Sequence, residues 1–171
     1  FLLVSCGKQL TSSTKTKHST NEVKVTEADS DIVNMIAPYK KELDGLMNKV
    51  IGFAEIELVK EEYQSTLGNF INDVVLKKSI EYHRKPIDFA LVTNGGLRTP
   101  IPQGNVTRGN IFELMPFENE LVILELKGIT VFKLANYAAA RGNAPMSGLK
   151  YEVFIKQPRN VFIQGEKLDT N

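Results

Sequence analysis

The chain has 171 residues, of which 42% are hydrophobic and 24% are charged, and its formal net charge is +1. This composition is typical of one globular domain with its own core, and the near-zero charge argues against nucleic acid as a partner. A single cysteine excludes an internal disulfide framework, and two histidines, His18 and His83, argue against a metal centre built on imidazoles.

The first residues read Phe-Leu-Leu-Val-Ser-Cys-Gly and contain no methionine. Such a segment is typical of the end of an apolar signal sequence, and residues 3–6 resemble the lipobox of bacterial lipoproteins. The alternative is an apolar strand with a buried cysteine. We interpret residues 1–6 as the end of a lipoprotein signal peptide, with Cys6 as the lipid attachment site. The Ser/Thr/Lys-rich residues 7–30 are then a flexible tether, and the protein is anchored in the cell envelope, in the periplasm or at the surface of a bacterium.

Residues 31–171 are predicted to form one α+β domain, in which helices pack on a mixed sheet. Apolar residues at helical spacing predict four helices, which begin at Asp31, Thr66, Thr107 and Gly128. The first contains Pro38, which predicts a kink or a break. Thr66 and Thr107 are the predicted caps of their helices, Pro116 ends the third, and Gly142 follows the fourth.

Strands are predicted where short apolar or alternating segments occur between the helices. These segments are residues 50–59, 88–93, 120–127, 149–155 and 160–163. The last two are joined by a predicted turn at Gln157-Pro158-Arg159. Because helices and strands alternate irregularly, we expect a mixed sheet and not a regular parallel one.

The first candidate binding residues follow the predicted strand 88–93. They are Asn94, the adjacent Gly95 and Gly96, and Arg98. Two glycines allow a sharp turn that exposes backbone N–H donors, and an arginine can bind a phosphate or a carboxylate with two parallel bonds. A plain tight turn and a solvated arginine are the more common meaning of each feature alone. Their combination at a strand end, where ligands of α/β sheets usually bind, indicates an anion site.

A second candidate is the aromatic residue Phe117, which stands between Pro116 and the polar residues Glu118 and Asn119. A partly exposed ring can stack on a base, which contributes ~1–3 kcal/mol. The alternatives are a core position for Phe117 and a turn-capping role for Asn119.

Gly68 stands in the first turn of the predicted second helix. Glycine costs ~1 kcal/mol there relative to alanine. We expect close approach of another backbone or of a ligand at this position, the alternative being a variation of the helix cap.

In order and spacing, these motifs resemble the C-terminal domain of the 5′-nucleotidase family, which includes bacterial UDP-sugar hydrolases and 2′,3′-cyclic-nucleotide phosphodiesterases. The similarity covers the chain from about Ala54 to Asp169. The matching segments are Leu67-Gly68-Asn69 with Asp73, Asp88-Phe89-Ala90, Asn94-Gly95-Gly96-Leu97-Arg98, Ile101-Pro102-Gln103-Gly104, Pro116-Phe117-Glu118-Asn119, Leu126-Lys127-Gly128 and Ser147-Gly148. The order of these pieces, more than any one of them, makes the resemblance specific.

The resemblance implies a domain that binds a nucleotide or nucleoside. By position, Arg98 corresponds to a phosphate- or carboxylate-contacting arginine, and Phe117 to one of two aromatic residues that enclose the base. Asn94 corresponds to a loop residue that contacts the base or orders the site, and Gly148 to a backbone contact near the ligand. The predicted substrate-binding residues are therefore Asn94, Gly95, Gly96, Arg98, Phe117, Asn119 and Gly148. No catalytic or metal-binding residue is predicted.

In such enzymes a separate N-terminal domain carries two divalent metals and an Asp–His catalytic pair. We recognise no such domain in this sequence, so the resemblance implies a separate metallophosphatase chain as partner, divalent metals only there, and no cofactor here. Lys60-Glu61-Glu62 stand where the family usually has an arginine, and the sequence stops before the second aromatic. We therefore expect a weakened phosphate site and a C-terminally truncated domain. The alternatives are a non-enzymatic surface lipoprotein that binds a nucleotide or another anionic metabolite, and a structural remnant that binds nothing.

Overall fold

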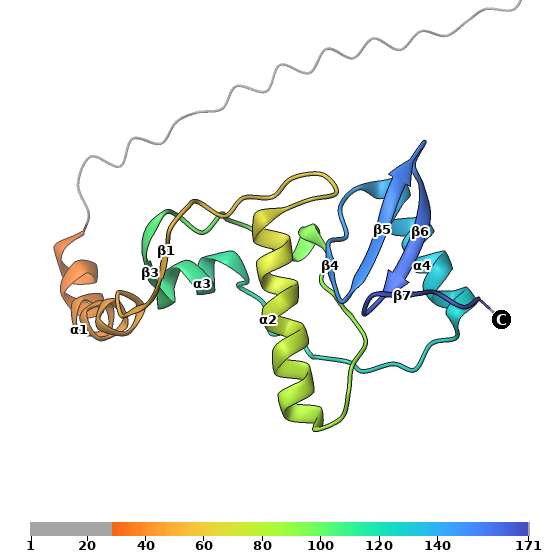
Figure 1. Ribbon diagram of the computed structural model, residues 1–171. Helices are drawn as coiled ribbons and strands as arrows, with labels where there is room; N and C mark the ends of the chain where they lie inside the picture. The colour runs from red at the N-terminus through yellow and green to blue at the C-terminus, as the bar shows by residue number, and fades with distance from the viewer. Residues whose placement is uncertain (1–28, 171) are drawn as a thin grey trace, which may run out of the picture. The chain divides into compact units, whose positions relative to one another are not determined.

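The computed structural model describes residues 29–170 (Figure 1). Cys6 and nearly all of the predicted tether lie outside the described residues, and Ser30, which was assigned to the tether, begins the first helix. The structure has two units, residues up to Pro38 and residues from Tyr39 onward, and the second contains the domain considered below. Among the described residues, no helix is both long and apolar enough to cross a membrane.

The α+β class is confirmed. The helices are α1 (Ser30–Met47), α2 (Thr66–His83), α3 (Arg108–Leu114) and α4 (Gly128–Arg141), with a 3₁₀ turn, η1 (Asn94–Gly96). The strands are β1 (Val50–Ala54), β2 (Ala90–Leu91), β3 (Gly104–Thr107), β4 (Met146–Ser147), β5 (Leu149–Phe154), β6 (Gln157–Ile163) and β7 (Glu166–Lys167). Pro38 lies inside α1, and the helix is continuous through it.

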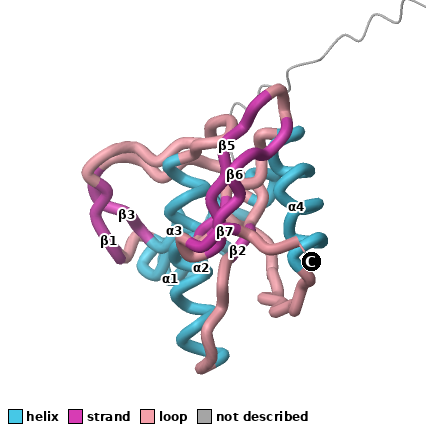
Figure 2. The backbone as a smooth tube through the Cα atoms, turned by 45° about the vertical axis from the view of Figure 1, so that its right-hand side comes forward, coloured by secondary structure: helices cyan, strands magenta, loops and turns pink. Residues whose placement is uncertain are grey.

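The strands form three small antiparallel sheets among the described residues, where one mixed sheet was expected. β1 pairs with β3, β2 pairs with β4, and the third sheet has the order β5-β6-β7. α2 packs against β2 and β4 (Figure 1), and α4 packs against β6 (Figure 2).

Two apolar clusters hold these elements together. The first joins α2, α3, β3 and the glycine-containing loop, and its buried members are Leu67, Ile71, Leu97, Ile101, Val106 and Leu114. The second joins α4 to the three-stranded sheet, and its buried members are Val131, Ala135, Leu149 and Val161. The first cluster includes Leu97, so it supports residues 94–98, where binding residues are predicted. Its members come from four separate segments of the chain.

The helix ends agree with the sequence in two cases and differ in one. Thr107 caps α3 in a capping box with Asn110, and Gly142 ends α4 with a left-handed φ of 65°. The cap of α2 is Ser65 and not Thr66, because the Ser65 hydroxyl accepts the Gly68 N–H at 2.9 Å. The Thr66 hydroxyl instead accepts the N–H of Val59.

The predicted strand over residues 120–127 is wrong. This segment runs without regular structure from α3 to α4 (Figure 1). Its large apolar side chains are all exposed, and they are Leu121, Val122, Ile123, Leu124 and Leu126. Alternating apolar and polar residues indicate a segment that can form a strand, but a strand also needs a partner for its hydrogen bonds. No described strand lies against residues 120–127.

The other strands differ in their bounds. β1 stops at Ala54, and further along only Leu58 makes an isolated bridge, to Ile101. β6 begins at Gln157, so the turn before it falls on Ile155 and Lys156, which both have positive φ. A two-residue connection with φ above zero matches the twist of an antiparallel hairpin, which explains why the turn precedes the predicted position.

Candidate functional site

Residues 94–98, here called the glycine loop, are held at both ends by backbone hydrogen bonds. The Asn94 N–H donates to the carbonyl of Asn143 at 2.9 Å, and the Arg98 N–H donates to the carbonyl of Leu114 at 2.8 Å. These two carbonyls belong to segments on either side of α4 in the sequence. The path of the glycine loop is therefore fixed by contacts that no local pattern encodes.

Lys60 adds a second cation to this loop. Its Nζ donates to the carbonyl of Leu97 at 2.7 Å in a partly buried hydrogen bond. Leu97 is the residue directly before Arg98. In the sequence Lys60 is noted only within Lys60-Glu61-Glu62, the segment where the family usually has an arginine, and it is not predicted as a binding residue. The lysine and the loop are 37 residues apart, so only the folded chain shows that they meet.

Asn94 orders the loop through its side chain. Its Nδ2 donates to the carbonyl of Glu61 at 3.2 Å, which ties the loop to the segment before α2. Its Oδ1 is buried without a hydrogen-bond partner among the described residues. Since such an acceptor costs ~1–3 kcal/mol, the packing around Asn94 has to offset it.

Arg98 and Phe117 lie together, as the resemblance implies. The guanidinium carbon of Arg98 is 4.9 Å from the centroid of the Phe117 ring, a cation–π distance. The ring is 49% exposed, so Phe117 is not a core residue and retains surface on which a flat ligand can stack. Lys60, Arg98 and Phe117 thus place two cations and one aromatic face at the glycine loop.

The two glycines do not both offer free amides. The Gly96 N–H donates to the carbonyl of Thr93 at 3.1 Å, and the Leu97 N–H donates to the carbonyl of Asn94 at 3.2 Å. These bonds close the turn η1 on itself, because a 3₁₀ turn pairs residues three apart. In this structure the Gly96 N–H is therefore paired within the turn, and Gly95 is the exposed member of the pair, while a role of either glycine in anion binding stays a prediction.

The described contacts of Asn119 and Gly148 are made within the chain, and their predicted roles in ligand binding stay predictions. The Asn119 Nδ2 donates to the carbonyl of Phe117 at 3.3 Å, which is the turn-capping alternative. Gly148 has a φ of +86°, and a Cβ there would collide with the carbonyl oxygen of Asp88 and lie 3.0 Å from the Phe89 Cα. Glycine is required at position 148 because the segment with Asp88 and Phe89 passes close to its backbone.

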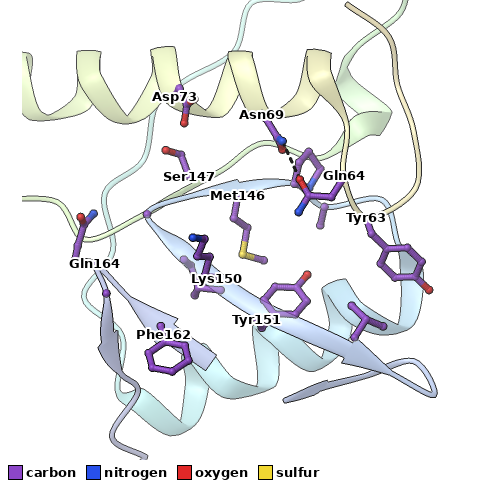
Figure 3. Close-up of a pocket in the computed structure, with 16 residues that line it drawn as sticks. Tyr63, Gln64, Asn69, Asp73, Met146, Ser147, Lys150, Tyr151, Phe162 and Gln164 are labelled. Carbon is purple, nitrogen blue, oxygen red and sulfur yellow. Dashed lines mark hydrogen bonds between the residues drawn. The ribbon is translucent and has the colours of Figure 1, made fainter. Parts of the chain in front are cut away.

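Gly148 lines a separate cavity of about 500 Å³ between α2 and the strands β4 to β6 (Figure 3). Asn69 and Asp73 extend into it from α2, and Ser147 and Lys150 extend from the opposite wall. Its aromatic lining residues are Tyr63, Tyr151 and Phe162. Burial raises the pKa of the Tyr151 phenol, and the neighbouring Tyr63 raises that pKa further. Neither Arg98 nor Phe117 lines this cavity.

Gly68 connects α2 to the glycine loop. A Cβ on Gly68 would collide with the Pro145 side chain, and it would lie 2.9 Å from the Ser65 Oγ and 3.0 Å from the Asn94 Oδ1. The close approach predicted from this glycine is confirmed, although side chains make it and not a backbone or a ligand.

Comparison with known proteins decides the family. The family described as "5'-nucleotidase, C-terminal domain" matches residues 49–171. The chain belongs to this family. The match covers the whole segment that holds α2, the glycine loop, the Arg98–Phe117 pair and β4 to β7.

Individual relatives of this 5′-nucleotidase C-terminal domain agree. The protein UshA of Yersinia enterocolitica is 29% identical over 155 residues, which are 84% of this chain and 27% of UshA. The trifunctional nucleotide phosphoesterase YfkN of Bacillus subtilis is 28% identical over 74% of this chain and 9% of YfkN. A 5′-nucleotidase precursor from Thermus thermophilus has a similar structure, with a TM-score of 0.66 and 29% identity over 80% of this chain and 30% of that one. The chain thus spans less than a third of each relative.

We expect Gly68→Ala to destabilise the domain by ~1–3 kcal/mol, because the added methyl group overpacks the contact with Pro145 and Asn94. Helix propensity alone predicts the opposite, a gain of ~1 kcal/mol. Urea unfolding measures the difference. The matched control is Gly45→Ala in α1, where a Cβ meets no atom within 4 Å and no loss is expected. Equal stabilities of the two variants would contradict the close approach.

Proposed function

We propose that this chain is the nucleotide- or nucleoside-recognition domain of a 5′-nucleotidase-type phosphohydrolase. The observation that carries the proposal is the Arg98 guanidinium over the half-exposed ring of Phe117. In the proposed complex a base stacks on the exposed surface of this ring, which contributes ~1–3 kcal/mol. Arg98 and Lys60 then face the anionic part of the ligand, and Asn94 holds the loop that carries Arg98.

The family and the names of the relatives support a nucleotide as the ligand. One relative is a nucleotide phosphoesterase and another a 5′-nucleotidase precursor. These proteins are several times longer than the matched segment, so their activity comes to this chain only as part of the proposal. In the proposed function, this chain binds and positions the substrate. Such positioning lowers the activation free energy of the reaction by several kcal/mol.

The chemical step requires further groups. Among the described residues, no group of three or more His, Cys, Asp and Glu side chains is placed to hold a metal ion. We propose that the two divalent metals are held outside the described residues, in a metallophosphatase domain or chain, where they would activate the attacking water and stabilise the charge at phosphorus. This chain contributes Arg98, Lys60 and Phe117, which orient the substrate toward that centre.

We expect the full chain to bind AMP, UMP and adenosine without added metal in a calorimetric titration. Phe117→Ala should weaken binding of all three by about 5- to 150-fold, because each loses its stacking surface. Arg98→Ala should weaken AMP and UMP by ~10- to 150-fold but adenosine far less, because adenosine has no phosphate.

The matched control for this titration is a second cation–π pair on α4. Arg141 lies 5.1 Å from the centroid of the Tyr137 ring, which is also 49% exposed. Arg141→Ala and Tyr137→Ala remove the same kind of contact and should leave the affinities unchanged. Absence of binding at millimolar ligand, or equal losses from both pairs, would reject the proposal.

The alternative function is a non-enzymatic surface lipoprotein that binds a nucleotide or another anionic metabolite. An activity assay with a metallophosphatase encoded by a neighbouring gene distinguishes the two functions. We expect the nucleotidase activity of that metallophosphatase to rise when the full chain is added, and to rise less with Arg98→Ala. An unchanged activity together with AMP binding in the calorimeter would favour the alternative.

We also propose that lipid on Cys6 anchors the protein in the cell envelope, from the sequence resemblance of residues 3–6. Expression of the full-length gene product in a bacterium should place it in the detergent phase of a Triton X-114 separation. Cys6→Ser should move it to the aqueous phase, because no acyl chain is then attached. A native protein already in the aqueous phase would exclude the anchor.

A further inference from the structure

We infer that Asn72 is a positioning residue that sets the course of the glycine loop and thereby the place of Arg98. The inference rests on the proposed function, because this loop carries the anion-binding arginine. Asn72 lies on α2, and its side chain is fully buried. It is absent from the motifs that the sequence analysis singled out.

The Asn72 side chain makes three hydrogen bonds. Its Oδ1 accepts the N–H of Val92 at 2.6 Å, and its Nδ2 donates to the carbonyl of Val92 at 3.2 Å. The same Nδ2 donates to the carbonyl of Gly68 at 2.8 Å. A primary amide has two donor hydrogens and one acceptor oxygen, so the two bonds from Nδ2 use both donor hydrogens and the third bond uses the oxygen. One side chain thus pairs both backbone groups of Val92, as a neighbouring strand would.

These bonds replace the sheet at the point where the chain leaves it. β2 pairs with β4 through Ala90 and Leu91 only. Val92 follows directly and bonds to Asn72 where the next ladder position would be. This accounts for the end of β2 at Leu91, two residues before the end of the predicted strand 88–93. From Val92 the chain turns through Thr93 into η1.

Both backbone partners of Asn72 lead to the same loop. Val92 precedes Asn94 by two residues, and Gly68 is the residue against which the Asn94 Oδ1 packs. Asn72 therefore fixes the entrance of the loop and the helix turn on which it rests. The carbonyls of Asn143 and Glu61 also hold the entrance of the loop, through Asn94, whereas Lys60 and the carbonyl of Leu114 act on its far end.

The chain offers a matched control on the same helix. Ser79 is 4% exposed on α2, and its Oγ donates only to the carbonyl of Val75 at 2.7 Å, within the helix. Asn72→Ala and Ser79→Ala therefore each remove a buried polar group from α2, but only the first releases the glycine loop. A merely structural role would make the two variants alike apart from their overall stability.

The experiment compares these variants in the full chain by AMP titration and by amide hydrogen exchange. We expect Asn72→Ala to bind AMP roughly tenfold more weakly than Ser79→Ala, since ~1.4 kcal/mol is a typical cost of lost hydrogen bonds. Exchange of the Leu97 and Arg98 amides, five and six residues from Val92, should be faster only in Asn72→Ala. Equal affinity and equal exchange in the two variants would overturn the inference.

Two further outcomes are decided in the same experiment. If the wild-type chain binds no AMP, the proposed function fails, and the Leu97 and Arg98 exchange rates alone decide for or against Asn72. If Asn72→Ala does not fold, Asn72→Ser takes its place. The serine side chain is neutral and polar but too short to reach both groups of Val92. The same comparison with Ser79→Ala then applies.

Discussion

The first two turns of α2 are packed so closely that a methyl group on Gly68 would collide with the Pro145 side chain and lie 3.0 Å from the Asn94 Oδ1. The candidate site depends on this contact. It allows the buried amide of Asn72 to reach Val92, and it brings the chain out of the sheet and into η1. A helix and a strand end that were further apart would leave Val92 unpaired, at a cost comparable to a lost hydrogen bond.

The site that results is assembled from three loops and contains little regular structure. Lys60 comes from the segment before α2, Arg98 from the glycine loop and Phe117 from the segment after α3. Lys60 bonds to the carbonyl of the buried Leu97, Arg98 bonds to the carbonyl of the buried Leu114, and the ring of Phe117 contacts Arg98. Loops on a packed support are the usual location of binding residues, because they can vary while the core positions them.

Many large apolar side chains of this domain remain exposed in the folded structure. The exposed segment between α3 and α4 and the exposed residues of β1, including Val50, Ile51 and Phe53, make up large apolar areas. Their side chains are no less hydrophobic than those of the core. Residues 120–127 differ from the core because no described strand pairs with them, so hydrophobicity and alternation alone predict a strand there that the structure does not contain.

The sequence by itself determined the α+β class, the family and the helices α2, α3 and α4, and a resemblance of motifs singled out Arg98 and Phe117, which the structure then brings together. Those features depend on local periodicity, on caps such as Thr107 and Gly142, or on motif order. Only the tertiary structure decided that Lys60 joins the loop, that Gly96 is not a free donor and that Asn72 pairs with Val92. Each of these is a hydrogen bond whose partner is chosen by the folded path of the chain. Donor and acceptor types are visible in a sequence, but their separation in space is not.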